Sequence, residues 1–204
     1  MINLYVVRHG QTKWNVERRF QGWLDSPLTE NGVKCAVDLR EQLSHIQFDA
    51  CYASTSPRAY KTLELILSSN TSDYRTDDRL KEIRLGAWQG MTHAQIEDGY
   101  PIELERFYDN PEDFKLEEAE TFTDVYNRVK SFIDDVVADH EAKKREQPDK
   151  EASNVLIVTH GVTLKLAQLI FDNAPLGELV NYNVAHNAQV HHYQYKKGTF
   201  DRIK

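Results

Sequence analysis

The stretch INLYVVRHG, residues 2–10, is a short apolar run that ends in an Arg-His-Gly tripeptide. Residues 48–53 and 155–158 form two further apolar runs, and each run is followed by a helical pattern. The apolar residues of these runs are nearly continuous rather than alternating, which is typical of parallel strands covered on both faces. The three runs therefore predict buried strands of a mostly parallel sheet.

Helical patterns lie between these runs. Thr29 is suited to cap one helix, Ser56 and Pro57 are suited to begin another, and residues 122–137 carry the strongest helical stripe. Pro148, in the charged stretch after that stripe, indicates a loop. We expect the first helix to bury one set of apolar side chains: Val33, Ala36, Val37 and Leu43.

Strands that alternate with helices predict the fold class, an α/β protein with a three-layer α/β/α sandwich and a mostly parallel central sheet. Residues 190–195 and 200–203 flank Lys197-Gly198 and are expected to form a hairpin that extends the sheet. No internal repeat or linker divides the chain, so residues 1–204 are predicted to form a single domain.

Residues 91–120 differ in composition from the rest of the chain, because they carry ten carboxylates and two basic residues. We expect a helical insertion here, which covers the active site as a lid and packs more loosely than the core. Its aromatic side chains favour a moderately apolar or broad pocket: Tyr100, Phe107, Tyr108 and Phe114.

The composition excludes several classes of protein. A formal net charge of -7 argues against a nucleic-acid partner, and no stretch is long enough to span a bilayer. The first residues lack the basic and long apolar regions of a secretory signal, so a cytoplasmic location is expected. The two cysteines and eight histidines form no cluster with metal-ligand spacing, so neither a metal nor a cofactor is predicted. The sequence makes no prediction of the oligomeric state.

Basic side chains are expected at the carboxyl ends of the three predicted strands, where open parallel sheets bind ligands. The first strand leads into Arg8 and His9, the second into a helix whose first turn carries Arg58, and the third into His160. Arginine is the preferred bidentate partner of a phosphate group, and a neutral imidazole can attack phosphorus. The pattern therefore predicts a phosphoryl-transfer site.

Further blocks extend this pattern along nearly the whole chain. Arg8-His9-Gly10-Gln11-Thr12 is followed by Asn15, by Phe20-Gln21-Gly22 and by blocks at residues 28–32, 54–58, 80–90 and 159–161. In this order they resemble the signature of the histidine phosphatase superfamily, also called phosphoglycerate-mutase-like. The resemblance implies an enzyme that transfers a phosphoryl group to a histidine.

The resemblance implies a role for each matching residue. His9 is the expected nucleophile, and Glu82 is expected to protonate the leaving alkoxide and then to accept a proton from water. Arg8, Arg58 and His160 are expected to surround the phosphoryl oxygens, with His160 cationic when phosphate is bound. The remaining binding residues implied by the pattern are Asn15, Gln21, Gly22 and Gly161.

Other readings of these residues stay open. Asn15 also fits a helix cap, and Gln21-Gly22 also fits an ordinary turn. The remaining histidines, His93 among them, are expected to be structural. The three tryptophans fit either the wall of the pocket or the core: Trp14, Trp23 and Trp88.

The predicted function is a metal-independent phosphomonoester phosphatase that acts on small phosphorylated metabolites through a phosphohistidine. A phosphoglycerate mutase is the first alternative. Mutases of the family typically carry a tyrosine three residues after the catalytic glutamate, where this chain has Leu85, and cations further along that hold a second anionic group. The acidic insertion would repel a multiply charged phosphoglycerate, which favours a phosphatase. A non-catalytic phosphate-binding module is the second alternative.

Overall fold

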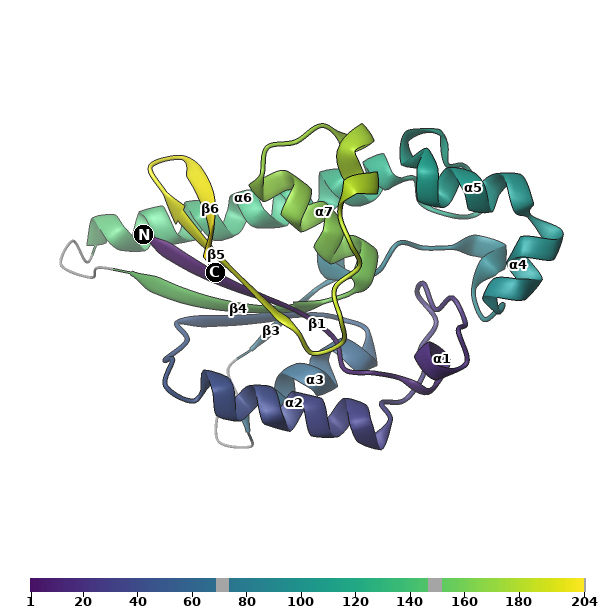
Figure 1. The fold of residues 1–204 in the computed structure, drawn as a ribbon. Coiled ribbons are helices and arrows are strands. Elements are labelled where there is room, and N and C mark those ends of the chain that lie inside the picture. Colours follow the sequence, from purple (N-terminus) through teal and green to yellow (C-terminus); the bar gives the residue numbers. More distant parts are fainter. Residues whose placement is uncertain (69–73, 147–151, 204) are drawn as a thin grey trace.

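The computed structural model describes residues 1–68, 74–146 and 152–203. Six strands form one sheet in the order β3-β2-β4-β1-β5-β6 (Figure 1). The first four strands along the chain are parallel, and the last two form an antiparallel hairpin beside β1. Their bounds are Ile2–Arg8 for β1, Ala50–Ser54 for β2, Arg75–Asp77 for β3, Ser153–Thr159 for β4, Val190–Lys196 for β5 and Thr199–Ile203 for β6.

Helices cover both faces of this sheet, which confirms the predicted α/β fold with a mostly parallel sheet. Helices α2 and α3 lie on one face, and α6 and α7 lie on the other (Figure 1). The α-helices are α1 Lys13–Val16, α2 Glu30–Leu43, α3 Pro57–Leu67, α4 His93–Gly99, α5 Pro101–Asp109, α6 Phe122–Glu146 and α7 Gly161–Phe171. Four short 3₁₀ turns are η1 Asp78–Leu80, η2 Gly86–Trp88, η3 Pro111–Asp113 and η4 Leu176–Asn181.

The three apolar runs of the sequence become neighbouring strands. β4 lies between β1 and β2, so the carboxyl ends of all three meet at one rim of the sheet. Arg8 pairs with Thr159 in the register, and the backbone N–H of His9 donates to the Thr159 carbonyl at 2.9 Å. The edge strand β3 is not predicted from the sequence, because its three residues, Arg-Thr-Asp, carry no apolar pattern.

Two hydrophobic clusters fill the space between the layers. Leu4, Val6 and Ile157 belong to the cluster under α6 and α7, whereas Val7 and Leu156 belong to the cluster over α2 and α3. Strands β1 and β4 therefore bury side chains on both faces, as their continuous apolar character predicted.

Helix α2 begins as predicted, with the Thr29 side chain accepting from the N–H of Gly32 at 3.0 Å. The expectation that Val33 is buried is wrong, since 38% of it is exposed. Gly32 faces the interior instead, and a Cβ added there would lie 2.1 Å from the Gln11 carbonyl oxygen. The next residue along a helix is turned by about 100°, so Val33 faces solvent.

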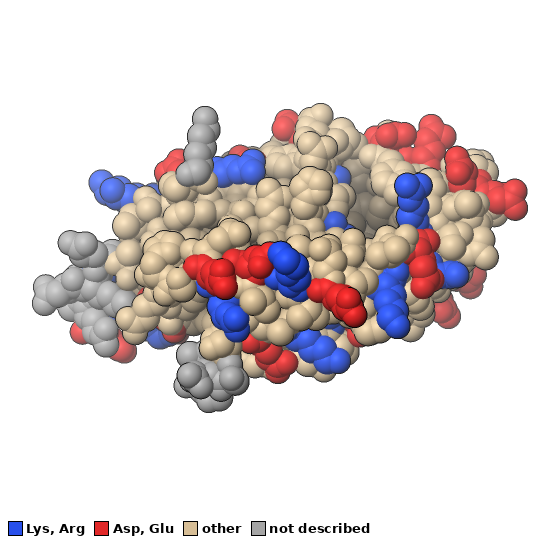
Figure 2. All heavy atoms as spheres, turned by 60° about the horizontal axis from the view of Figure 1, so that its bottom comes forward, with Lys and Arg blue, Asp and Glu red and all other residues tan. Residues whose placement is uncertain are grey.

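The insertion is anchored more firmly than its composition predicted. Ile96 and Phe114 are fully buried, and Tyr100, Phe107 and Phe114 pack around the buried Trp88 at ring-centroid distances of 6.2, 5.7 and 5.4 Å. Acidic side chains gather at the outer end of this region (Figure 2). The insertion thus packs into the same hydrophobic cluster as β1, β4 and α6, under a charged surface.

Two further sequence expectations concern membrane-spanning helices and a loop. Within the described ranges, no helix combines the length and the apolar character that crossing a membrane requires. The loop predicted at Pro148 lies outside the described residues.

Candidate active site

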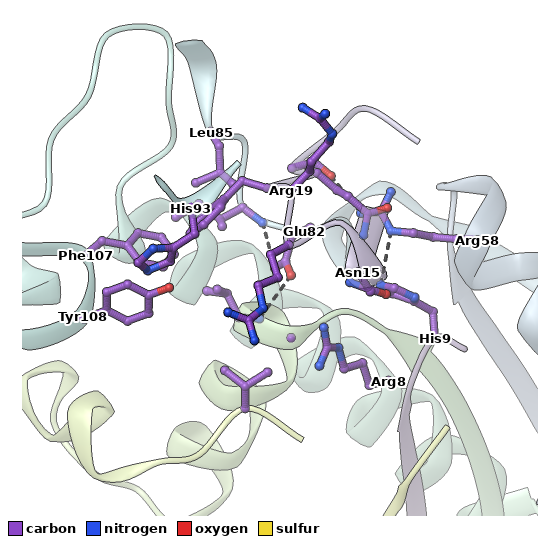
Figure 3. Close-up of a pocket in the computed structure, with 18 residues that line it drawn as sticks. Arg8, His9, Asn15, Arg19, Arg58, Glu82, Leu85, His93, Phe107 and Tyr108 are labelled. Carbon is purple, nitrogen blue, oxygen red and sulfur yellow. Dashed lines mark hydrogen bonds between the residues drawn. The ribbon is translucent and has the colours of Figure 1, made fainter. Parts of the chain in front are cut away.

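A pocket of about 410 Å³ opens at the rim where β1 and β4 end. Two groups of side chains line it on different sides (Figure 3). We call them the polar end, formed by Arg8, His9, Arg58 and Glu82, and the aromatic end, formed by Phe20, His93, Phe107 and Tyr108.

His9 lies at the base of the polar end and is only 2% exposed. Its Nδ1 is 2.8 Å from the carbonyl oxygen of Gly10, which can only accept, so Nδ1 carries the proton and Nε2 carries the lone pair. Arg58 Nε donates to that Nε2 at 3.2 Å. Burial lowers the pKa of His9 well below its ordinary value, and the charges of Arg58 and Arg8 lower it further. The lone pair of the neutral imidazole therefore lies on Nε2.

Arg58 lies in the first turn of α3, where Pro57 begins the helix as predicted. Its side chain is 1% exposed and is fixed on three sides. Nη1 donates to the Leu24 carbonyl and Nη2 to the Gly22 carbonyl, each at 2.8 Å, and Asp25 forms an ion pair at 3.2 Å. The loop that carries Gly22 thus aims the guanidinium at His9.

Arg8 reaches the pocket from the end of β1. Its Nη1 donates to the Ala185 carbonyl at 2.8 Å, whereas its Nε is buried and has no hydrogen-bond partner. Gly161 lies beside this nitrogen, and a Cβ added to it would lie 3.6 Å from both Arg8 Nε and Glu82 Oε2. The glycine therefore leaves the space between a cation and a carboxylate open.

His160 lies behind His9 and does not itself line the pocket. The two rings meet edge to face with centroids 5.1 Å apart. His160 Nε2 is 2.8 Å from Ser54 Oγ, and its Nδ1 is buried without a partner. Burial lowers the pKa of His160 well below its ordinary value, and the Arg58 charge adds to this. A bound phosphate anion would raise the pKa of His160. A cationic His160 is expected only in that phosphate-bound state.

Glu82 is held by the beginning of α7. Its Oε1 accepts from the backbone N–H groups of Ile83 at 3.0 Å and Thr163 at 3.3 Å, and its Oε2 accepts from Val162 at 3.3 Å. A carboxylate at this position also interacts favourably with the helix dipole. Glu82 therefore faces the pocket with a fixed orientation.

The other predicted binding residues lie around the same cavity. Asn15 lines the pocket and is also part of the capping box of α1, with its Oδ1 accepting from the N–H of the N-cap Thr12 at 3.0 Å. Gln21 lines the pocket, and its buried Oε1 has no partner. Gly22 has a φ of +52°, and a Cβ there would lie 2.5 Å from Gln89 Oε1, which explains why this turn needs a glycine.

The aromatic end is a closed ring of side-chain contacts. Phe20 packs on His93 and Phe107 at centroid distances of 6.2 and 5.9 Å, and Tyr108 packs on the same two residues at 6.1 and 5.3 Å. Leu85 lies beside this ring and lines the pocket (Figure 3). The expected apolar character of the insertion is present at Phe107 and Tyr108, whereas Tyr100 and Phe114 pack against Trp88.

Backbone pairing holds the aromatic end in place. Phe20 exchanges hydrogen bonds with Met91 and Gly90 at 3.0 and 2.8 Å, and the N–H of His93 donates to the Arg18 carbonyl at 3.0 Å. This pairing joins the loop after α1 to the start of the insertion. It brings His93, Arg18 and Arg19 to the pocket, which the sequence did not predict, because no local pattern reports contacts across 70 residues.

The tryptophans lie outside the pocket lining. Trp88 is fully buried in the core, and Trp23 is 43% exposed and donates from Nε1 to the Glu82 carbonyl at 2.9 Å. Among the residues that the structure describes, no group of three His, Cys, Asp or Glu side chains could hold a metal ion.

Comparison with known proteins identifies the family. Residues 4–203 match the family model of the histidine phosphatase superfamily (branch 1), and the chain belongs to that superfamily. The resemblance inferred from the ordered blocks is therefore confirmed.

Its relatives include both phosphatases and mutases. The chain is 33% identical over 165 residues to "Phosphoserine phosphatase 1" of Hydrogenobacter thermophilus, covering 81% of this chain and 74% of that protein. It is 30% identical over 164 residues to "Probable phosphoglycerate mutase GpmB" of Proteus mirabilis, covering 80% and 72%. Among solved structures, Bacillus stearothermophilus YhfR superposes with a TM-score of 0.88 at 37% identity, covering 99% of this chain and 95% of that one.

Proposed function

We propose that this chain is a metal-independent phosphomonoester phosphatase that acts on small phosphorylated metabolites through a phosphohistidine. One observation carries the proposal, the hydrogen bond between His9 Nδ1 and the Gly10 carbonyl. It leaves the lone pair of a neutral imidazole on Nε2, at the polar end of the pocket, where Arg8 and Arg58 also lie. Such a nitrogen is a nucleophile suited to phosphorus.

The reaction consists of two displacements. In the first, His9 Nε2 attacks phosphorus, the bond from phosphorus to the ester oxygen breaks, and Glu82 donates its proton to the leaving alkoxide. In the second, water attacks the phosphohistidine, Glu82 accepts the water proton, and the P–N bond breaks to release phosphate and neutral His9. The position of Glu82 on the pocket wall supports this acid–base role.

The arginines supply the positive charge for this chemistry. Arg58 Nε donates to His9 Nε2. When the substrate binds, a phosphoryl oxygen would accept this N–H instead, which leaves the lone pair of His9 Nε2 available to attack phosphorus. The unpartnered Nε of Arg8 offers a second donor from the other side. Charge-assisted hydrogen bonds to the phosphoryl oxygens stabilise the transition state.

The far side of the pocket favours hydrolysis over the mutase reaction. Leu85 lines the pocket where a tyrosine is typical of mutases in this family, and neither of the two basic residues in the insertion, Arg106 and Lys115, lines it. A second phosphate or a carboxylate on a phosphoglycerate therefore meets the aromatic end, with Arg18 and Arg19 as the cations near it. We also propose a single domain over residues 1–204 and a cytoplasmic location.

The test is a panel of phosphomonoesters that includes 3-phosphoglycerate and phosphoserine. Released phosphate and isomerised product are both measured, and a His9→Ala preparation purified in parallel controls for contaminating phosphatases. We expect free phosphate from several esters and no isomerised phosphoglycerate.

Each other outcome corresponds to one alternative. Isomerisation that is faster than phosphate release would make the protein a mutase. Tight binding of phosphate esters without turnover by the wild type would make it a binding module.

A further inference from the structure

Arg128 on α6 does not line the pocket, yet every N–H donor of its guanidinium forms a hydrogen bond. A guanidinium has five N–H donors. Nη1 donates to the carbonyls of Arg79 and Lys81, each at 2.7 Å, and Nη2 donates to the Glu82 carbonyl at 3.0 Å. The remaining two bonds, at 2.9 and 3.0 Å, go to the carboxylate of Glu120. All of its donors are used, and its side chain is only 15% exposed.

These contacts converge on the segment that carries Glu82. The segment comprises the last two residues of η1 and residues 81–85, which belong to no helix or strand, so no regular ladder fixes the backbone of Glu82. Side chains satisfy its carbonyl groups instead. Thr159 Oγ1 donates to the Leu80 carbonyl at 2.8 Å, and Thr163 Oγ1 donates to the Lys81 carbonyl at 2.7 Å. Arg128 is the group that joins three of these peptide units to one rigid helix.

Glu120 extends the same support to the far side of Glu82. Its Oε2 accepts from the Arg84 N–H at 2.8 Å, and its own N–H donates to the Arg84 carbonyl at 2.9 Å. The Arg128–Glu120 ion pair therefore forms hydrogen bonds with the backbone both before and after residue 82. The carboxyl group of Glu82 is held separately, by the N–H groups at the start of α7.

We propose that Arg128 is a positioning residue for Glu82. It fixes the backbone so that the carboxyl group meets the ester oxygen of the substrate, and Glu120 keeps the guanidinium in the plane that reaches all three carbonyls. This inference rests on the proposed acid–base role of Glu82. A displacement of about 1 Å at a reacting group can reduce the rate by roughly 100-fold, so a small shift of this segment is sufficient for a measurable effect.

The leaving group distinguishes this role from general support of the fold. p-Nitrophenolate leaves readily without a proton, whereas a simple alkoxide requires one. Loss of Arg128 should therefore slow the hydrolysis of an alkyl phosphate much more than that of p-nitrophenyl phosphate.

The experiment compares kcat and KM for both esters in Arg128→Met, Arg128→Lys and Glu120→Gln. We expect Arg128→Met to lower kcat/KM, which reports the steps up to formation of the phosphohistidine, by roughly 10- to 100-fold for the alkyl ester and only a few-fold for p-nitrophenyl phosphate. Lysine lacks the planar fork and should recover little. Glu120→Gln should shift the ratio of the two rates in the same direction by a smaller factor, and it serves as the test if Arg128→Met does not fold.

Arg79→Met is the matched control. Arg79 also ties this region to α6, through Asp135 at 2.6 Å, but its guanidinium touches none of the carbonyls of Lys81 or Glu82. Its loss should lower thermal stability without changing the ratio of the two rates.

A double-mutant cycle completes the test. If Arg128 acts through Glu82, Arg128→Met should have no leaving-group-selective effect in a Glu82→Gln background. Equal losses of kcat/KM on both esters, or a selective loss of kcat/KM that persists in Glu82→Gln, would overturn the inference while leaving the phosphatase proposal intact. A wild type that hydrolyses neither ester would refute the proposed function, and the inference with it.

Discussion

The two ends of the pocket are built in different ways. At the polar end, His9 and Arg58 are 2% and 1% exposed, and hydrogen bonds to the backbone carbonyls of Gly10 and Gly22 fix their positions. At the aromatic end, Tyr108 is 45% exposed and is held by ring contacts with His93 and Phe107. At the polar end hydrogen bonds fix the side chains themselves, whereas at the aromatic end hydrogen bonds fix only the backbone and ring packing positions the side chains.

This difference follows from what each end has to recognise. A phosphoryl group has one size, one geometry and a fixed charge, so buried donors in fixed places suit it. The alcohol of a phosphomonoester varies, and apolar contacts discriminate between alcohols by only a few kcal/mol. Changes at the polar end should therefore alter the rate for every substrate, and changes at the aromatic end should alter the preference among substrates.

The largest effect is expected from His9→Ala. Removal of a nucleophile lowers kcat by roughly 10⁴- to 10⁶-fold in enzymes of comparable design, and the loss should be similar for every ester. His186→Ala, an exposed histidine that does not line the pocket, is the control and should keep full activity. A loss of kcat restricted to some esters would contradict the claim that the polar end serves every substrate alike.

A second variant tests whether the polar end requires the guanidinium of Arg58 and not only its positive charge. Arg58→Lys keeps the charge but loses the fork that reaches both Gly22 and Leu24, and we expect kcat/KM to fall by roughly 100-fold. Arg19→Lys is the matched change near the aromatic end, where Arg19 bonds Glu17 and the Gly90 carbonyl. It should change kcat/KM by less than about threefold. Similar losses in the two variants would contradict the account.

Stability against pH reports the burial of the two histidines. Burial holds the pKa of His9 and of His160 below the value of about 6.5 that an unfolded chain shows. Below pH 6.5 the unfolded state then binds more protons than the folded state, so the free energy of unfolding should fall as the pH drops.

The same burial gives a measurable slope. Each histidine contributes up to about 1.4 kcal/mol per pH unit to the dependence of the free energy of unfolding on pH. Urea unfolding between pH 7 and 5.5 should therefore show that this free energy depends less steeply on pH in His9→Asn than in the wild type, by up to about that amount. Because burial keeps the pKa of His9 well below its ordinary value, protonation of His9 should add no acid limb near pH 6.5 to kcat/KM beyond the one that ionisation of the phosphomonoester, with a second pKa of about 6, produces. Equal slopes in wild type and variant would place the His9 ring in a wetter environment than the structure describes.

The smallest effect is expected from Tyr108→Ala. Loss of this half-exposed ring should raise KM for a bulky aryl phosphate by roughly three- to tenfold and leave a small alkyl phosphate unchanged. Tyr195→Ala, on the hairpin strand β5, is the control for a lost tyrosine away from the pocket. A uniform loss of kcat on all esters would assign Tyr108 to the chemistry instead.

The sequence predicted what is encoded locally. The apolar runs specified three adjacent strands, and the residues that follow each run, such as His9 and Arg58, converge because parallel strands share a carboxyl end. Thr29 began its helix as expected, since a cap depends on residues three positions away.

What the sequence did not predict depends on contacts between distant segments. The place of His93 in the pocket follows from pairing between residues 18–20 and 90–93. Arg128 has the sequence context of an ordinary helix-surface residue, and only the tertiary structure brings three carbonyls of another segment to it. The firm packing of the insertion was missed for a similar reason, because its acidic composition describes the outer surface and not the rings around Trp88.

The position of the transferred phosphoryl group tests the central claim most directly. The wild type is mixed with a phosphomonoester labelled in its phosphoryl group, quenched in alkali during turnover, digested and analysed by mass spectrometry. The account predicts a phosphoryl group on His9 that survives alkali and is lost in acid, and none on His9→Asn. A phosphoryl group on another side chain, or product formed with His9 unmodified at every quench time, would contradict it.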